Sequence, residues 1–388
     1  MHSRTMLNVE KLSYWERKTF FDKIDFLIIG AGIVGYSTAI NLRALHPNSK
    51  IVIIERGYLP SGASSKNAGF ACFGSATELM DDLESMPEKK VWDTVELRWK
   101  GLTQLRKLIG DDNLKLQING SWDLISNDQD PLFLKTKENI PYLNAQIEKI
   151  TGEKDVYSIE SNIKSKFGFN KITTSIKNRL EGQIDTASMN EAFYKKAVNA
   201  SIHTLFGIEA KEINNQAGNV IINTSSGEIK AAKVALCTNG FSKTFLPNED
   251  ILPARAQVLI TKPIKGLKLE GTFHFEQGYY YFRNIDNRIL LGGGRNIDFE
   301  GETTTKLENS AKITQRLNQI LKDIVLPNTP FELDHQWAGI MAVGKTKKPI
   351  IKECLPNLYC GVRLGGMGVA IGSLVGKQLS ELMTINKV

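Results

Sequence analysis

The stretch "DFLIIGAGIVGYSTAI", residues 25–40, decides the fold of this chain. Its apolar pattern predicts a buried strand over residues 25–29 and a helix over residues 33–45. "KIVIIE", residues 50–55, predicts a second buried strand. A strand, a helix and a strand in so short a span form a unit with parallel strands and a right-handed crossover. The strands are apolar on both faces, as a sheet covered on both sides requires.

Three glycines follow the first strand in the pattern G-x-G-x-x-G. Gly30 permits the tight turn, Gly32 lets the backbone approach a pyrophosphate, and Gly35 lets the helix pack close to the strand. The helix N-terminus then offers unpaired N–H groups and a partial positive charge. Glu55 ends the second strand, where a carboxylate accepts hydrogen bonds from ribose hydroxyls. These features predict a site for an adenine dinucleotide.

A competing phosphate-binding pattern occurs near the C-terminus. "GIMAVGKT", residues 339–346, matches G-x-x-x-x-G-K-[ST]. Such a loop must open a helix whose first turn holds the Lys and the Thr. Pro349 follows shortly after Thr346, and "KKPIIKE" has no helical periodicity. We therefore expect no nucleotide at this second pattern.

Composition excludes several classes of protein. The 388 residues suggest two domains. The net charge is 49 − 42 = +7, but the lysines are scattered, so we expect no nucleic-acid partner. The four cysteines have no C-x-x-C spacing and the five histidines are isolated, so we expect a reducing compartment and no metal site. No apolar run reaches the ~18 residues of a membrane span. There is no secretory signal, so we expect a cytoplasmic protein.

The changing sequence patterns along the chain predict an α/β fold. One of its domains is expected to be discontinuous, built from segments that are separated in the sequence. Residues 1–22 look like an amphipathic arm anchored by Tyr14, Trp15, Phe20 and Phe21. The dinucleotide-binding domain is expected over 23–110, 181–245 and 335–388. A β-rich substrate or cap domain, with alternating patterns typical of antiparallel strands, is expected over 111–180 and 246–334.

Two further motifs favour FAD over NAD. "SGASSKNAGF", residues 61–70, is a small, polar loop after the second strand. "GVRLGGMGVAIG", residues 361–372, precedes a long C-terminal helix. A second helix N-terminus directed at the ligand suits a flavin, because the reduced ring gains negative charge.

With "VALCTNG", "RILLGGG" and "WAGIM", these motifs resemble the D-amino-acid-oxidase-like (DAO) family of FAD-dependent oxidoreductases. That family includes D-amino-acid dehydrogenase, glycine oxidase and γ-glutamylputrescine oxidase. The resemblance covers residues 24–385. It implies an FAD-binding Rossmann-like domain of the glutathione-reductase type with an interleaved antiparallel-β substrate domain. It also implies a non-covalent FAD, so we expect no covalent bond to Cys72.

The resemblance implies FAD contacts from five segments. Those expected at the pyrophosphate, ribose and adenine are Gly30, Gly32, Ile33, Val34, Gly35, Glu55, Arg56, Ala210, Thr238, Asn239 and Gly240. Those expected along the ribityl chain and the flavin are Ser64, Ser65, Asn67, Ala68, Gly69, Gly365, Gly366, Met367, Gly368 and Val369.

The chain departs from the family at the substrate. Members that act on α-amino acids often carry an arginine in a G-[LF]-R-P motif, whose fork binds the substrate carboxylate. Met341 stands in that place here, and Lys347 or Lys348 replaces an aspartate common after the motif. These departures favour the branch that acts on amines, or a carboxylate anchored elsewhere.

The candidate catalytic residues follow from that departure. Arg363, just before the glycine loop, is the expected replacement anchor; its alternative is a surface arginine. Alternation places Tyr279, Tyr281 and Arg283 on one face of a strand, where a packed, structural strand is the alternative. Lys345 is a candidate cation for oxygen reduction, or else a solvated loop residue.

The family chemistry is oxidation of a C–N bond by hydride transfer to flavin N5, which gives an imine. An uncharged amine has a lone pair that assists this step, so no strong base is required, and the sequence has no evident acid–base pair. One alternative is a 2-hydroxy-acid dehydrogenase, which needs a base for the hydroxyl proton. Others are a tRNA-modifying flavin enzyme and a non-catalytic flavoprotein. The substrate and the electron acceptor, oxygen or a quinone, stay open.

Overall fold

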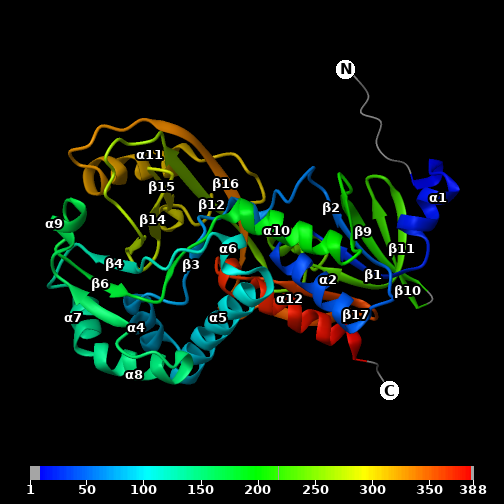
Figure 1. Cartoon of the computed structure of the whole chain (residues 1–388), viewed down its shortest axis with the longest axis horizontal. Coiled ribbons are helices and arrows are strands. Elements are labelled where there is room, and N and C mark those ends of the chain that lie inside the picture. Colours follow the sequence, from blue (N-terminus) through cyan, green and yellow to red (C-terminus); the bar gives the residue numbers. More distant parts are fainter. Residues whose placement is uncertain (1–8, 217, 386–388) are drawn as a thin grey trace.

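The computed structural model describes residues 9–216 and 218–385. Two eight-stranded sheets organise this part of the chain. They lie in separate lobes, with β1, β2 and β11 on the right of Figure 1 and β12, β14 and β16 on the left. The sequence crosses between the lobes several times.

The first sheet is built on the predicted strand–helix–strand unit. β1 (Ile24–Ile29) pairs in parallel with β2 (Ile51–Glu55) on one side and β11 (Gly227–Leu236) on the other. Alternate residues of β1 enter different cores, Ile28 on one face and Leu27 on the other, so both faces are buried. The other strands are β8 (His203–Phe206), β18 (Leu358–Val362), β17 (Ile350–Leu355), β9 (Ala210–Gln216) and β10 (Asn219–Thr224).

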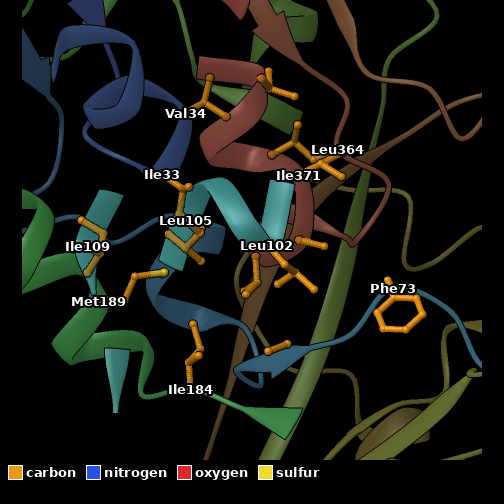
Figure 2. Packing of buried hydrophobic residues seen from close by; sticks show 14 of the residues in the cluster. Ile33, Val34, Phe73, Leu102, Leu105, Ile109, Ile184, Met189, Leu364 and Ile371 are labelled. Atoms are coloured by element: carbon orange, nitrogen blue, oxygen red, sulfur yellow. The ribbon is translucent and has the colours of Figure 1, made fainter. Parts of the chain in front are cut away.

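One face of this sheet is covered by long helices. They are α2 (Ile33–Leu45), α10 (Thr186–Asn199) and α12 (Gly368–Thr384), and α5 (Glu88–Ile109) packs against α12. Figure 2 shows Leu102 and Leu105 of α5 near Ile371 of α12, and all three belong to one buried cluster. α2 ends at Leu45 because Pro47 follows and disfavours a helical residue before it. This packing fixes where α2 and α12 begin.

The second sheet has the order β16–β12–β15–β14–β13–β4–β6–β5. Its pairs are antiparallel except for β13 with β4. Phe273 and Phe282 stack at 4.8 Å in the core beneath α11 (Ala311–Ile320). The strands are β4 (Ser121–Ile125), β5 (Tyr157–Glu160), β6 (Thr174–Asn178), β12 (Leu252–Thr261), β13 (Thr272–Phe275), β14 (Tyr280–Ile285), β15 (Arg288–Gly293) and β16 (Leu333–Val343).

Short elements join the lobes and cover their edges. β3 (Phe70–Ala71) pairs with β7 (Gly182–Gln183) in a small separate sheet. The short helices are α1 (Tyr14–Glu16), α3 (Ala63–Lys66), α4 (Ala76–Ser85), α6 (Asp111–Leu114), α7 (Pro131–Glu138), α8 (Ile140–Thr151) and α9 (Ile163–Phe167). The single turns are η1 (Val9–Lys11), η2 (Arg17–Phe21), η3 (Asn239–Thr244), η4 (Arg295–Ile297) and η5 (Leu321–Val325).

Three expectations about the architecture can be compared with these elements. The boundary expected at residue 335 falls inside β16, which pairs with β12 in the second sheet, so the return to the first sheet comes at β17. Tyr14 and Trp15 are 67% and 74% exposed and anchor nothing, whereas Phe21 packs against the first sheet. Residues 1–8 of the arm lie outside the described residues.

The second phosphate-loop pattern, residues 339–346, does not open a helix. β16 ends at Val343, and the strand β17, not a helix, follows at Ile350. The N–H of Lys345 donates to the Asp250 carboxylate at 2.8 Å.

Among the described residues, no helix is long and apolar enough to cross a membrane.

Candidate functional site

A large cavity lies between the two sheets. Its volume is about 770 Å³. The first lobe contributes the ends of β1 and β2 and the N-termini of α2 and α12, and the second contributes residues of β12, β13 and β14. Ligands of open α/β sheets bind outside the carboxyl ends of the strands, which is where this cavity lies.

The glycine turn brings α2 close to β1. Gly30 has φ = +106°, and a side chain there would also lie 2.9 Å from the carbonyl of Cys237. A Cβ at Gly35 would overlap with the carbonyl oxygen of Gly30. Both positions therefore require glycine. The N-terminus of α2 consequently opens directly into the cavity.

Side chains from other segments hold this end of the cavity in place. The Glu55 carboxylate accepts from the N–H groups of Ala31 and Gly57, each at 3.0 Å. The Arg56 guanidinium lies 3.8 Å from the centre of the Phe241 ring. Glu55 is therefore fixed at the end of β2, where the sequence predicts a ribose contact.

The loop over residues 61–70 folds onto the start of α2. The N–H of Ile33 donates to Ser64 Oγ at 3.0 Å. Asn67 accepts from the N–H of Gly69 at 2.8 Å and donates to the carbonyls of Ala63 and Ser64. Asn67 thus shapes its own loop through its side chain.

The glycine loop before α12 forms the opposite wall. Gly365 and Gly366 have φ values of +59° and +80°. Asn239 Oδ1 accepts from the N–H groups of Arg363 and Leu364, which ties this loop to the end of β11. Two helix N-termini, those of α2 and α12, therefore face one cavity.

The predicted FAD residues converge on this cavity. All of them line it except Gly35, Ser65 and Gly240. Gly240 lies against the carbonyl of Met341, and a side chain there would collide with it. The donor set fits FAD: a glycine cradle and helix N-terminus for the pyrophosphate, a fixed carboxylate for a ribose, and a second helix N-terminus for the electron-rich ring edge.

Arg363 does not reach the cavity, so its expected role as a carboxylate anchor does not fit the structure. Its guanidinium donates to the Asp250 carboxylate at 2.6 Å, to Thr346 Oγ1 at 2.9 Å and to the carbonyl of Lys348. These partners, with the carbonyl of Asp250, occupy the whole fork. Arg363 therefore stabilises the loops beside the glycine turn.

Lys345 is also outside the cavity: its side chain is exposed. Lys347 lines the cavity instead, where it binds Glu78 at 2.8 Å and Asp82 at 2.6 Å. Arg98 binds Glu78 at 3.2 Å. Burial opposes ionisation of Glu78, but the two cations outweigh it and lower its pKa to about 2. The four charges balance, so none of them is left for a ligand.

The prediction that one strand face carries three site residues agrees with the structure only in part. The residues are Tyr279, Tyr281 and Arg283. Tyr281 lines the cavity. Tyr279 also lines it but precedes β14. Arg283 lies behind Gly69, where an added Cβ would be 3.0 Å from its guanidinium, and is absent from the lining. Burial lowers its pKa to about 10, and its Nε has no partner among the described residues. Arg283 therefore lies behind the Gly69 turn and not in the cavity wall.

Sequence reasoning missed Arg295, which lines the cavity. Its Nε is enclosed and has no hydrogen-bond partner, and no ion pair neutralises its charge within residues 9–216 and 218–385. The guanidinium carbon lies 5.0 Å from the centre of the Phe299 ring. Burial lowers the pKa of Arg295. Its position directly after the "GGG" of the RILLGGG motif was the available signal.

A second missed group is the cluster of Cys72, Glu181 and His274. One ligand atom from each lies within 4.8 Å of the others. Cys72 and His274 also line the cavity. Burial raises the pKa of the Cys72 thiol well above its usual value, so the thiol is unreactive. The expectation of no metal site rested on sequence separation, which says nothing about this long-range cluster.

Comparison with known proteins agrees with the architecture. The chain is 24% identical to a probable oxidoreductase, OrdL, of Rhizobium meliloti (strain 1021), covering 93% of this chain and 83% of the relative. It is 21% identical to gamma-glutamylputrescine oxidoreductase of Escherichia coli (strain K12), covering 92% and 83%. The crystal structure of glycine oxidase from Bacillus cereus ATCC 14579 superposes with a TM-score of 0.74 at 18% identity, covering 93% and 95%.

The family match spans nearly the whole chain. Residues 25–382 match the DAO family, described as FAD dependent oxidoreductase. The match includes the glycine turn after β1 and the loop before α12, the two segments that face the cavity. The chain therefore belongs to the DAO family of FAD-dependent oxidoreductases.

Proposed function

We propose that the protein oxidises the C–N bond of an amine that also carries a carboxylate, an amino acid or an N-substituted amino acid, to the imine. The observation that carries this proposal is the unneutralised guanidinium of Arg295 in the cavity wall. Arg295 is partly buried, and its enclosed Nε has no hydrogen-bond partner among the described residues. A carboxylate is the ligand that a guanidinium fork fits best. Arg295 thus binds the substrate carboxylate in place of the arginine that the family often carries where this chain has Met341.

The rest of the cavity is compatible with this substrate. Met341 is apolar where a carboxylate-binding arginine would be expected, and the charges around Glu78 are already balanced. Phe70 and Tyr281 meet edge to face at 5.6 Å and both line the cavity, so they exclude water from one side of it. When bound, FAD supplies a two-electron acceptor. The relatives named for gamma-glutamylputrescine and glycine support an amine or an amino acid as the class.

The first test is an anaerobic titration of the visible flavin band. Glycine, sarcosine, L-proline and D-alanine are each compared with the matched amine without the carboxylate: methylamine, dimethylamine, pyrrolidine and ethylamine. The expected result is bleaching by one or more amino acids and much weaker bleaching by the matched amines. Lactate tests the alternative 2-hydroxy-acid dehydrogenase. His274 lines the cavity and offers the base that oxidation of a hydroxyl group requires. Bleaching by lactate alone would overturn the proposed substrate class.

The second test changes the anchor. Arg295→Met should raise the KM for the amino acid about 100-fold, since a lost charge-assisted fork contributes ~3 kcal/mol. The matched control is Arg288→Met, because Arg288 starts β15 a short distance upstream, binds Asp334 and does not line the cavity. An Arg295→Met enzyme with an unchanged KM would refute the anchor.

A further inference from the structure

His274 places an imidazole at the cavity wall with one nitrogen enclosed. It comes from β13, lines the cavity, and packs edge-on against the Phe70 ring at 5.1 Å. Its Nε2 is inaccessible and has no hydrogen-bond partner among the described residues. Nδ1 is the nitrogen left to face the cavity. An enclosed imidazole nitrogen without a partner is uncommon, because burial of an unpaired polar atom is costly.

A second orphaned atom lies beside it. Glu181 is fully buried just before β7. One carboxyl oxygen, Oε1, accepts from the N–H groups of Phe73 at 2.7 Å and Gly74 at 2.9 Å. The other, Oε2, is buried and has no hydrogen-bond partner among the described residues, while the Ser121 hydroxyl lies beside the carboxyl group. A carboxyl oxygen of Glu181 and a ring nitrogen of His274 lie within 4.8 Å of each other, so a hydrogen bond between them requires the two side chains to approach.

We propose that His274 accepts the proton from the substrate ammonium and that Glu181 positions the imidazole and takes up the proton from its far side. This rests on the proposed function. The N–H bond of the ammonium breaks and a bond forms between that proton and Nδ1 of His274. The proton on Nε2 moves to Oε2 of Glu181. No electrons are transferred, and the product is the neutral amine, whose lone pair the oxidation of the C–N bond requires.

The electrostatics of the pair suit one shared proton. Burial raises the pKa of Glu181 to about 7 and lowers that of His274 to about 4. Above pH 7 the pair therefore consists of a carboxylate and a neutral imidazole, which together can accept one proton. The groups that lie beside Glu181 on neighbouring elements are Cys72, Glu78, Ser121, Tyr157 and His274. Arg98 is paired with Glu78, and within residues 9–216 and 218–385 no cation forms an ion pair with the Glu181 carboxylate.

Asp123 provides a matched control. It is also a buried carboxyl, and burial raises its pKa to about 6. It differs from Glu181 in that Thr77 satisfies it, through its N–H at 3.0 Å and its hydroxyl at 2.6 Å. Asp123→Asn therefore removes a neighbouring buried carboxyl without touching the proposed pair.

The first experiment needs no substrate. The ring nitrogens of ¹⁵N-histidine-labelled holoenzyme are titrated by NMR, and His274→Asn assigns the signal, with His274→Gln in reserve if that variant does not fold. In the wild type the His274 signals should shift through a step near pH 7, when Glu181 ionises. Glu181→Gln should abolish that step and Asp123→Asn should keep it. An unchanged His274 titration in Glu181→Gln would overturn the pairing.

The second experiment follows the rate of flavin bleaching by sarcosine, glycine, L-proline or D-alanine against pH. The wild-type rate should rise through an apparent pKa near 7. Glu181→Gln should lose that step and be slower by at least about 10-fold at pH 8, within the range of general-base effects. Asp123→Asn should stay within about twofold of the wild type. If no amino acid bleaches the flavin, the proposed function fails, and the NMR titration still decides the pairing.

The same cluster also contains the donor atoms of a transition-metal site. Zinc chloride added to the metal-free holoenzyme distinguishes the two roles. Binding of one Zn²⁺ per chain that Cys72→Ser and Glu181→Gln both abolish would overturn the proton relay. Absence of stoichiometric binding supports it.

Discussion

The ion pair between Arg363 and Asp250 gives the sharpest test of the role of Arg363. The structure indicates that Arg363 stabilises loops and does not anchor a substrate carboxylate. Arg363 has φ = +63° in the turn before α12, and its guanidinium is closed in by Asp250, Thr346 and Lys348. The Asp250 carboxylate also accepts from the N–H of Lys345 at 2.8 Å. Asp250→Asn keeps the size of the side chain but removes its charge. It leaves the guanidinium enclosed without a counter-ion.

The magnitude follows from how exposed the two partners are. The side chain of Arg363 is 9% exposed and that of Asp250 is 35% exposed. Breaking a fully buried pair costs about 3–5 kcal/mol, and losing a surface pair costs about 0–1 kcal/mol. We expect Asp250→Asn to lower the free energy of unfolding by about 2 kcal/mol, between these limits. The KM for the substrate should stay within about twofold, because Arg363 does not line the cavity.

The assay is urea unfolding followed by flavin release, alongside steady-state kinetics. The matched control is Glu332→Gln, which removes an equally short but exposed pair with Lys262, at 2.6 Å and with side chains 74% and 57% exposed. That change should leave the free energy of unfolding without a measurable difference, because both charges are solvated. Two results would refute the reasoning: equal stability losses in the two variants, or a KM in Asp250→Asn that rises as far as in Arg295→Met.

Three further predictions concern the cofactor and the buried groups. Gly35→Ala should yield protein without flavin, because a Cβ there overlaps with the adjacent backbone, whereas Gly62→Ala, which meets nothing within 4 Å, should bind flavin normally; the flavin content of the purified proteins measures both. Acid precipitation should release all the flavin from the wild type, because the Cys72 thiol is buried and its raised pKa keeps it protonated; coloured precipitate would contradict this. The raised pKa of Glu181, about 7 against the usual 4.5, means that its contribution to stability is present below pH 4.5 and is lost as pH rises through 7. Relative to Glu181→Gln, the wild type should lose about 3 kcal/mol between pH 4.5 and pH 8 in urea titrations, and a constant difference would contradict it.

The dinucleotide-binding part of the fold could be predicted because its signals are local. The strand, the glycine turn and the helix over residues 24–45 follow from apolar runs and from backbone conformations that only glycine permits. Pro349 excluded a helix after residue 346 for an equally local reason. The hairpin of β10 and β11 turns at Ser225 and Ser226, and Gly227, with φ = +110°, begins β11. The membership of β16 was missed because its partner, β12, lies far away in sequence.

The candidate site shows the same division between local and long-range determinants. The sequence by itself determined which backbone segments line the cavity, since glycine loops and helix starts depend on neighbouring residues. Only the tertiary structure decided which charged side chains remain available there. Arg363 meets Asp250, 113 residues away, and is neutralised, whereas Arg295 forms no ion pair within the part of the chain that the structure describes. The availability of a charge depends on its partners, and long-range strand pairing brings those partners together.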